Sequence, residues 1–185
     1  MPTINMLNTK YIISGNIATD TIPNKQALGN AGFVKGILVE KDAASVMKRL
    51  DKFNPKDTAI VELKDKIQSL ETIGPDSTAS IELVNNNNDE VNYTSKNSKT
   101  QLAVFSEIYY DLGWKAYIDD KETPIVKVNY VLRSIVVPPG THKIRFEFKP
   151  QSLDISKKAS GVASILLWGL LAFAGFKAYN EYKNK

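Results

Sequence analysis

The longest uncharged run in the chain lies near its C-terminus and limits what the chain can fold into. Residues Ala159 to Phe176 read ASGVASILLWGLLAFAGF and include no charged side chain. As an α-helix this run is roughly 27 Å long, close to the thickness of the hydrocarbon core of a bilayer. Its leucine and phenylalanine residues fall on every side of the helix, whereas a core helix of a soluble protein keeps a polar stripe. We therefore predict a transmembrane helix at residues 159–179, followed by a short basic tail at residues 180–185.

Basic residues flank this run on both sides and leave its orientation open. The upstream ones are Lys143, Arg145, Lys149, Lys157 and Lys158, and the downstream ones are Lys177, Lys183 and Lys185. By the positive-inside rule the larger upstream count favours a cytoplasmic domain, but the short tail is denser in lysine. The first five residues have neither the basic nor the apolar region of a secretory signal. Two alternatives follow: a tail-anchored protein with its bulk in the cytoplasm, or the C-terminal part of a longer multi-spanning chain.

The composition excludes several chemistries. Among 185 residues there is no cysteine and only one histidine, His142. The chain therefore lacks disulfides, thiolate ligands and a cysteine nucleophile, and it is poorly supplied for a histidine metal site or a serine–histidine triad. Its net charge is only +4, and its acidic and basic residues are interleaved, whereas nucleic-acid-binding proteins concentrate Lys and Arg on one face. With no glycine-rich phosphate loop either, we expect no cofactor, no metal and no nucleic-acid partner.

Residues 1–75 carry the pattern of a small β/α subdomain. Lys10 to Ile13 reads as a short strand, and residues 33–40 (FVKGILVE) read as a strand rich in β-branched side chains. Asp42 suits the N-cap of a helix, and apolar residues then recur at helical spacing until Asn54-Pro55 ends the run. Residues 58–63 (TAIVEL) return to a strand. This half therefore predicts a strand–helix–strand unit.

Residues 76–156 predict a β-sandwich-like domain. Strands at residues 80–84 and 91–94 are joined by an asparagine-rich turn, and apolar and polar residues alternate from residue 101 to 150. In the last strand Ile144, Phe146 and Phe148 share one face. Short strands every ~8–12 residues, with turn residues between them, are typical of a sandwich. The predicted fold class is mainly β, with one C-terminal transmembrane helix.

A series of motifs in residues 104–150 carries a family resemblance. It comprises Ser106-Glu107, Tyr109-Tyr110, Gly113-Trp114, Ala116-Tyr117, Asp119, Asn129-Tyr130, Arg133, Gly140, His142, Phe146, Phe148 and Pro150. With these motifs the segment resembles the C-terminal extracytoplasmic β-domain of the YfhO-like family of bacterial membrane proteins. Residues 6–13 and 27–31 are also similar to that family. The segment departs from the family at Asp111-Leu112, where a proline-containing turn is usual, so the resemblance does not predict the conformation of that loop.

The resemblance implies a function and a location. Members of the family look like multi-spanning glycosyltransferases of the lipid-linked-sugar (GT-C) type or their relatives, and this chain is similar only to their tail. Their catalytic carboxylates have no counterpart here, so the resemblance implies an accessory, non-catalytic domain. It also implies a bacterial cytoplasmic membrane, with the β-domain outside the cytoplasm and the C-terminus inside. The implied partners are the lipid bilayer, upstream transmembrane helices of the same parent protein, and a glycan or lipid-linked sugar. The alternative is a stand-alone tail-anchored scaffold or interaction protein.

The aromatic residues between positions 109 and 130 are the candidate ligand contacts. We name Tyr110, Trp114, Tyr117 and Tyr130 as glycan or interface contacts. Such rings stack on sugars, but aromatic side chains also dominate ordinary cores, and a core with a tyrosine rim is the alternative interpretation.

Charged residues in the same region have structural explanations. Glu107 and Arg133 lie within apolar strands, so we expect an ion pair if the strands are neighbours; the alternative is a ligand contact. Asp119, Asp120 and Glu122 have the residue types of a glycosidase carboxylate pair, but they surround a chain reversal, and turn chemistry accounts for them. We therefore predict no catalytic residue in this chain.

Overall fold

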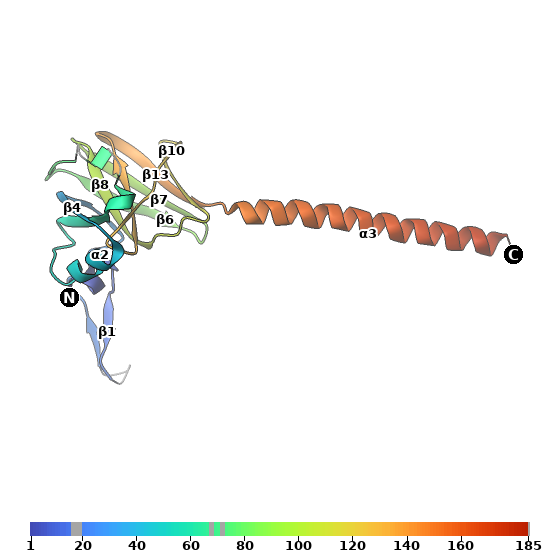
Figure 1. Ribbon diagram of the computed structural model, residues 1–185, viewed down its shortest axis with the longest axis horizontal. Coiled ribbons are helices and arrows are strands. Elements are labelled where there is room, and N and C mark those ends of the chain that lie inside the picture. Colours follow the sequence, from blue (N-terminus) through green and yellow to red (C-terminus); the bar gives the residue numbers. More distant parts are fainter. Residues whose placement is uncertain (16–19, 67–68, 71–72, 185) are drawn as a thin grey trace. The chain divides into compact units, whose positions relative to one another are not determined.

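The computed structural model describes residues 1–15, 20–66, 69–70 and 73–184 (Figure 1). It divides into two compact units, Met1–Phe148 and Lys149–Lys185. The first unit contains the sheets, and the second contains one long helix. The predicted class, mainly β with one C-terminal helix able to cross a membrane, is confirmed.

A five-stranded antiparallel sheet forms one layer of the first unit. Its strand order is β10-β9-β13-β7-β6. The strands are β6 (Ser80–Asn86), β7 (Glu90–Asn97), β9 (Trp114–Ile118), β10 (Lys121–Thr123) and β13 (Gly140–Phe148). The long strand β13 lies between β7 and β9 and joins the two hairpins of the sheet.

The second sheet has six strands in the order β3-β8-β12-β11-β5-β4. They are β3 (Ala31–Val34), β4 (Gly36–Glu40), β5 (Thr58–Glu62), β8 (Gln101–Ile108), β11 (Val126–Val128) and β12 (Leu132–Val137). Strands from both sides of residue 75 contribute to this sheet. The described residues of 1–75 and of 76–148 therefore share one set of backbone hydrogen bonds within the first unit.

The six-stranded sheet curls so that its two ends meet. Strands β3 and β4 stand at opposite ends of the strand order, yet only Lys35 separates them in the chain. Residues 33–40 were expected to form a single strand; instead, the part before Lys35 pairs with β8 and the part after it pairs with β5. The backbone N–H of Lys35 donates to the carbonyl of Asp57, 2.8 Å away. This hydrogen bond holds the chain at the position where it changes strand partners.

The strand–helix–strand unit follows its sequence pattern closely. Strand β4 leads into α2 (Ala43–Arg49), and β5 then pairs with β4 in parallel. The Asp42 side chain caps the helix by accepting from the backbone N–H of Ser45 at 2.8 Å. Val46 and Leu50 are buried against the sheet in the same hydrophobic cluster as β5. The capping hydrogen bond holds the pKa of Asp42 below its usual value.

The remaining short elements precede or connect these sheets. They are α1 (Pro2–Met6), the hairpin of β1 (Tyr11–Ile13) and β2 (Thr21–Pro23), and the 3-10 turn η1 (Leu63–Asp65). Met6 of α1 is buried in the cluster that fills the curled sheet.

Two hydrophobic clusters stabilise the first unit. One lies between the two sheets and is centred on Tyr93, Phe105 and Phe146, whose ring centroids are 4.7–6.3 Å apart in edge-to-face arrangements. The other is aliphatic and lies inside the curled sheet, with Leu102, Ile60 and Leu132 among its members. Alternate residues of β8 and β12 therefore enter different clusters.

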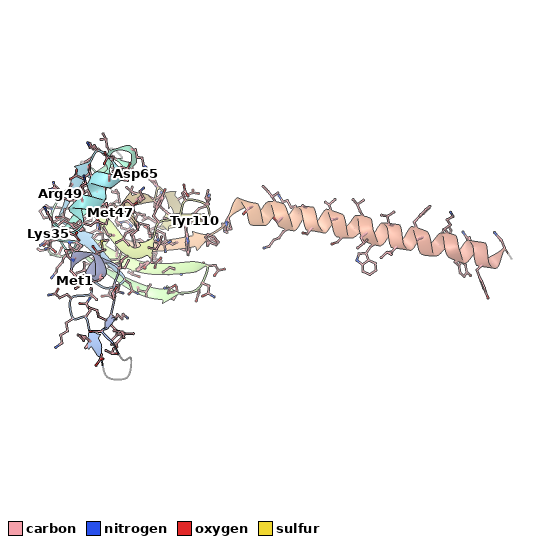
Figure 2. The ribbon with its side chains drawn as sticks, turned by 60° about the horizontal axis from the view of Figure 1, so that its bottom comes forward. Met1, Lys35, Met47, Arg49, Asp65 and Tyr110 are labelled. Carbon is pink, nitrogen blue, oxygen red and sulfur yellow. The ribbon has the colours of Figure 1, made fainter. Side chains whose placement is uncertain are left out.

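The second unit is the helix α3 (Gln151–Lys183). Its stretch Ile155–Lys177 is 23 residues long and has the length and hydropathy needed to cross a membrane. Large apolar side chains along it, such as Leu166, Trp168 and Phe173, are 64–71% exposed, and side chains project from the helix along its length (Figure 2). This apolar surface lacks the polar stripe that a water-facing helix carries.

Candidate functional site

Aromatic side chains line a small pocket at one end of the sandwich. The pocket has a volume of about 190 Å³ and is lined by Tyr109, Tyr110, Asp111, Trp114, Lys115, Ala116, Glu122, Thr123, Pro124 and Ile125. Tyr109 and Tyr110 follow β8, and Trp114 begins β9. A hydrogen bond of 2.7 Å from the backbone N–H of Tyr109 to the carbonyl of Val131 anchors the loop between these strands.

Phe148, the last residue of β13, supports the two candidate rings of this pocket. Its ring centroid lies 5.4 Å from that of Trp114 and 6.4 Å from that of Tyr110. A Cβ atom on Gly113 would come within 2.7 Å of the Phe148 ring, so the chain needs glycine there. Tyr110 is 49% exposed and lies at the surface (Figure 2). The predicted contacts Tyr110 and Trp114 are thus brought together.

Charged groups accompany the rings. The Nζ atom of Lys115 lies 3.0 Å from a carboxylate oxygen of Glu122, across the β9–β10 hairpin. This hydrogen bond raises the pKa of Lys115. Asp111 is exposed on the loop between β8 and β9. The pocket therefore offers aromatic faces beside carboxylate acceptors and an amino donor.

A buried arginine lies behind the pocket. Arg133 is 2% exposed, and its guanidinium carbon is 4.3 Å from the ring centroids of both Trp114 and Phe146. It forms an ion pair with Glu107, which also accepts a 2.9 Å hydrogen bond from the hydroxyl of Tyr93. Burial lowers the pKa of Arg133 to about 10, so the side chain is still cationic at neutral pH. Burial also raises the pKa of Tyr93 to about 12.

The other two candidate tyrosines lie outside this pocket. Tyr117 lies on the face of β9 opposite Trp114, the face that also carries Lys115 and Glu122, and the guanidinium carbon of Arg145 lies 4.3 Å from its ring. Tyr130 lies in the turn between β11 and β12 with a φ of 72°, a left-handed conformation that is unusual for a bulky residue. The structure therefore separates the four aromatic candidates into one pair and two isolated residues.

The acidic residues of the β9–β10 turn serve the turn itself. Asp119 and Asp120 have φ values of 48° and 65°, as a two-residue primed hairpin turn requires. The Asp119 carboxylate lies 2.7 Å from Nδ1 of His142 and accepts the backbone N–H of Lys143 at 2.9 Å. These hydrogen bonds, that from His142 foremost, lower the pKa of Asp119. Across the described residues, no group of three or more histidine or acidic side chains is placed to hold a metal ion.

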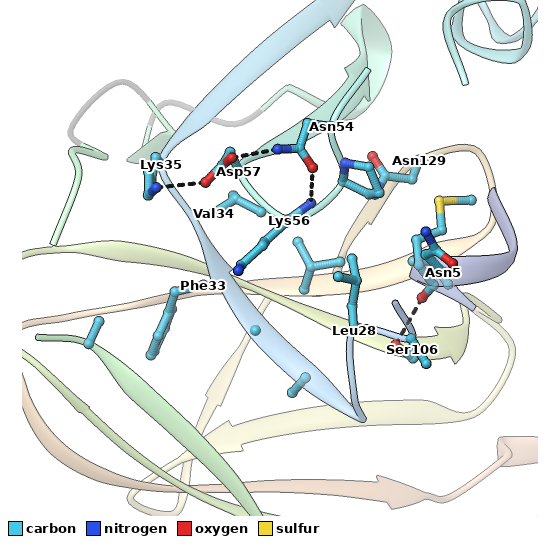
Figure 3. A pocket seen from close by; sticks show the side chains of 18 of the residues that line it. Asn5, Leu28, Phe33, Val34, Lys35, Asn54, Lys56, Asp57, Ser106 and Asn129 are labelled. Atoms are coloured by element: carbon cyan, nitrogen blue, oxygen red, sulfur yellow. Dashed lines mark hydrogen bonds and ion pairs between the residues drawn. The ribbon is translucent and has the colours of Figure 1, made fainter. Parts of the chain in front are cut away.

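A larger cavity, which the sequence analysis did not predict, opens on the curled sheet (Figure 3). Its volume is about 730 Å³, and its lining includes residues from α1, β3, β8 and β12 and from the loop before β5. None of its lining residues belongs to the aromatic pocket.

Comparison with known families identifies the chain. Residues 49–157, more than half of its length, match the family described as bacterial membrane protein YfhO. The chain belongs to this family. No curated protein and no solved structure matches it significantly. Together with the membrane-crossing stretch of α3, the family assignment makes this chain a membrane protein.

The matched segment of this YfhO-family protein contains the whole aromatic pocket. It also contains Glu107 and Arg133 and runs from α2 to the first turns of α3. The match covers only part of the large cavity, because Asn5, Leu28 and Val34 in its lining precede residue 49. Tyr110 and Trp114 could be named from the sequence because they are aromatic residues of one short segment. Pro124 and Phe148 come close to them only because β9 pairs with β10 and with β13.

Proposed function

We propose that this YfhO-family chain is an accessory, non-catalytic domain of a bacterial membrane glycosyltransferase of the GT-C-like type, acting on lipid-linked or cell-envelope glycans. The β-rich unit lies outside the cytoplasmic membrane, and the residues after α3 lie in the cytoplasm. Upstream transmembrane helices of the parent protein supply the catalytic carboxylates. The role of the β-rich unit is to hold a glycan next to those helices.

The observation that carries this proposal is the half-exposed Tyr110 ring at the edge of a pocket with carboxylate neighbours. The C–H face of a sugar ring is apolar and packs on an aromatic ring, while its hydroxyl groups donate to carboxylates. Asp111 supplies such an acceptor, and the ion pair of Lys115 with Glu122 adds a carboxylate and an amino group with further hydrogen-bonding capacity. The pocket therefore presents both kinds of contact that a glycan needs.

The size of the pocket favours one unit of a longer glycan. Sites that enclose a whole small ligand usually have a volume of about 300–1,000 Å³. The aromatic pocket, at about 190 Å³, is smaller than that. We therefore expect one sugar residue to bind on Tyr110 while the rest of the chain extends into solvent.

Trp114 has a supporting role in this proposal. Arg133 lies 4.3 Å from its ring centroid and Phe148 lies 5.4 Å away, so neighbours within the protein occupy much of its surface. Tyr110 has the more exposed ring and is the main sugar contact. Phe148 precedes the membrane-crossing stretch at Ile155 by seven residues in sequence.

Glycan binding by the full chain in nanodiscs tests this proposal. The probe is a set of oligosaccharides released from the envelope of the host bacterium, titrated by isothermal calorimetry. We expect Tyr110→Ala to weaken binding by about tenfold or more, equivalent to 1.4 kcal/mol, and Tyr110→Phe to retain most of the affinity. Tyr11→Ala is the matched control, because Tyr11 is an exposed tyrosine of β1 and does not line the pocket. Absence of binding in the wild type, or equal losses in both alanine variants, would overturn the proposal.

A further inference from the structure

The large cavity on the curled sheet has an apolar floor. Met6, Leu28, Val34, Val104 and Leu132 line it, and three of these are buried members of the aliphatic cluster. Gly32 of β3 also lines the cavity, and no atom lies within 4 Å of the position that a Cβ atom would take there. The floor thus has room for an apolar group beside β3.

Two cationic side chains at the rim are not used by the fold. Lys35 pairs with Asp57 at 2.7 Å, but Lys25 and Lys56 form no ion pair with any residue that the structure describes. Figure 3 shows Lys56 pointing into the cavity from the loop before β5. The rim therefore presents amino groups that are free to meet an anion.

The acidic residues of the lining are already satisfied. Asp57 accepts from Lys35 and from the Asn54 amide. Asp76 accepts from the hydroxyl and backbone N–H of Thr78 and from Ser98, and these hydrogen bonds, Thr78 first, lower its pKa. Both carboxylates are thus engaged within the protein, and the unpaired charge at the cavity is positive.

Asn129 adds an unused donor at the cavity wall. It is 1% exposed, and its Oδ1 accepts the backbone N–H of Ile60 at 2.8 Å. Its Nδ2 has no hydrogen-bond partner in the described part of the chain. Leaving such a buried N–H group unpaired costs about 1–3 kcal/mol, so an acceptor on a bound molecule would gain from reaching it.

From these features we infer that the cavity binds a small amphiphilic anion, an organic phosphate or carboxylate that carries a short apolar group. The apolar group packs on Leu28, Val104 and Leu132, and the anion lies at the rim beside Lys25 and Lys56. This site is separate from the aromatic pocket, and the inference does not rest on the proposed glycan contact.

Calorimetry with hexyl phosphate on the full chain in zwitterionic nanodiscs tests the inference. We expect hexyl phosphate to bind about tenfold or more tightly than either hexyl glucoside, which lacks the charge, or inorganic phosphate, which lacks the apolar group. Doping the nanodiscs with an anionic lipid distinguishes the source of the ligand. Competition with hexyl phosphate supports a lipid headgroup, and unchanged affinity supports a soluble ligand.

Two glycines provide a matched pair of variants. Gly32→Leu fills the cavity, whereas Gly36→Leu places the same side chain into open space on β4, outside the cavity. We expect Gly32→Leu to weaken hexyl phosphate binding by about tenfold or more and Gly36→Leu to leave it unchanged. Lys56→Gln, with Lys121→Gln as its charge-matched control, gives a second comparison that does not alter the backbone.

Three results would overturn the inference. They are absence of hexyl phosphate binding in the wild type, equal binding of hexyl glucoside, and equal effects of the two variants within both matched pairs.

Discussion

Strands β8 and β12 carry two hydrophobic faces that are packed in different ways. The face toward the five-stranded sheet meets interlocking aromatic rings, with Phe105 and Phe146 4.7 Å apart between centroids. The face inside the curled sheet is aliphatic, and near Val104 and Leu132 it borders a cavity of about 730 Å³. Because side chains alternate along a strand, the same two strands serve a closed core and an open site. The first face only stabilises the fold, whereas the second face stabilises it and also borders a cavity.

The largest expected effect comes from the closed aromatic face. Phe146 is fully buried, contacts two other rings and lies 4.3 Å from the Arg133 guanidinium carbon. We expect Phe146→Ala to lower the free energy of unfolding by about 3–5 kcal/mol, since it leaves a cavity in a packed core. Urea unfolding of the full chain, followed by tryptophan fluorescence, measures this. A loss below about 1 kcal/mol would mean that this face is not tightly packed.

The buried ion pair on the same face is the second test. Arg133→Met leaves Glu107 without its partner, and we expect a loss of about 3 kcal/mol. The double variant Arg133→Met/Glu107→Leu removes both charges and is expected to recover part of that loss. Arg49→Met is the control, since its 3.0 Å pair with Glu40 is at the surface and contributes about 0–1 kcal/mol. If the double variant were less stable than Arg133→Met, the ion pair would not be the cause.

The buried phenol of Tyr93 is expected to make the free energy of unfolding depend on pH. Burial raises its pKa from 10.0 to about 12, so the folded protein keeps the phenol proton after the unfolded chain has lost it. The contribution of this phenol to the free energy of unfolding is fully present below the pKa that Tyr93 has in the unfolded chain. It is lost as the pH rises from about 10 to 12. We expect Tyr93→Phe to flatten this part of the stability profile, as measured by urea unfolding at a series of alkaline pH values. An unchanged slope would assign the effect to another group.

The smallest expected effects come from substitutions that add a larger side chain to each of the two faces. Ala103 is fully buried toward the aromatic cluster, and Ala103→Leu is expected to cost about 1–3 kcal/mol by overpacking. Gly32 faces open space, so Gly32→Leu is expected to change the free energy of unfolding by less than about 0.5 kcal/mol. Thermal unfolding of both variants makes the comparison. Equal destabilisation would show that the cavity face is packed as closely as the aromatic face.

Features that depend on alternation within one segment could be predicted from the sequence. The inward set Ile144 and Phe146 of β13 and the strand–helix–strand unit follow from local patterns. The curl of the sheet could not be predicted, because residues 33–40 look like one strand and the change of partner at Lys35 depends on distant strands.

The aromatic pocket and the large cavity also differ in how far each depends on contacts between distant segments. Tyr110 and Trp114 are four positions apart, so their shared pocket was within reach of sequence analysis, although Phe148 was not. The large cavity joins segments remote in sequence, such as Met6 and Ser106, which lie 100 positions apart and are linked by a hydrogen bond from the Ser106 hydroxyl to the Met6 carbonyl. No local pattern marks a contact of that kind.

The most direct test of the proposed function is the side of the membrane on which the β-rich unit lies. The chain has no cysteine, so single cysteines at exposed positions report location without interference. We expect Leu112→Cys to react with a membrane-impermeant maleimide in intact bacteria that express the protein, and Lys183→Cys to react only after permeabilisation. The reverse pattern would contradict a glycan-holding domain outside the cytoplasm and would favour a tail-anchored scaffold with its β-rich unit in the cytoplasm.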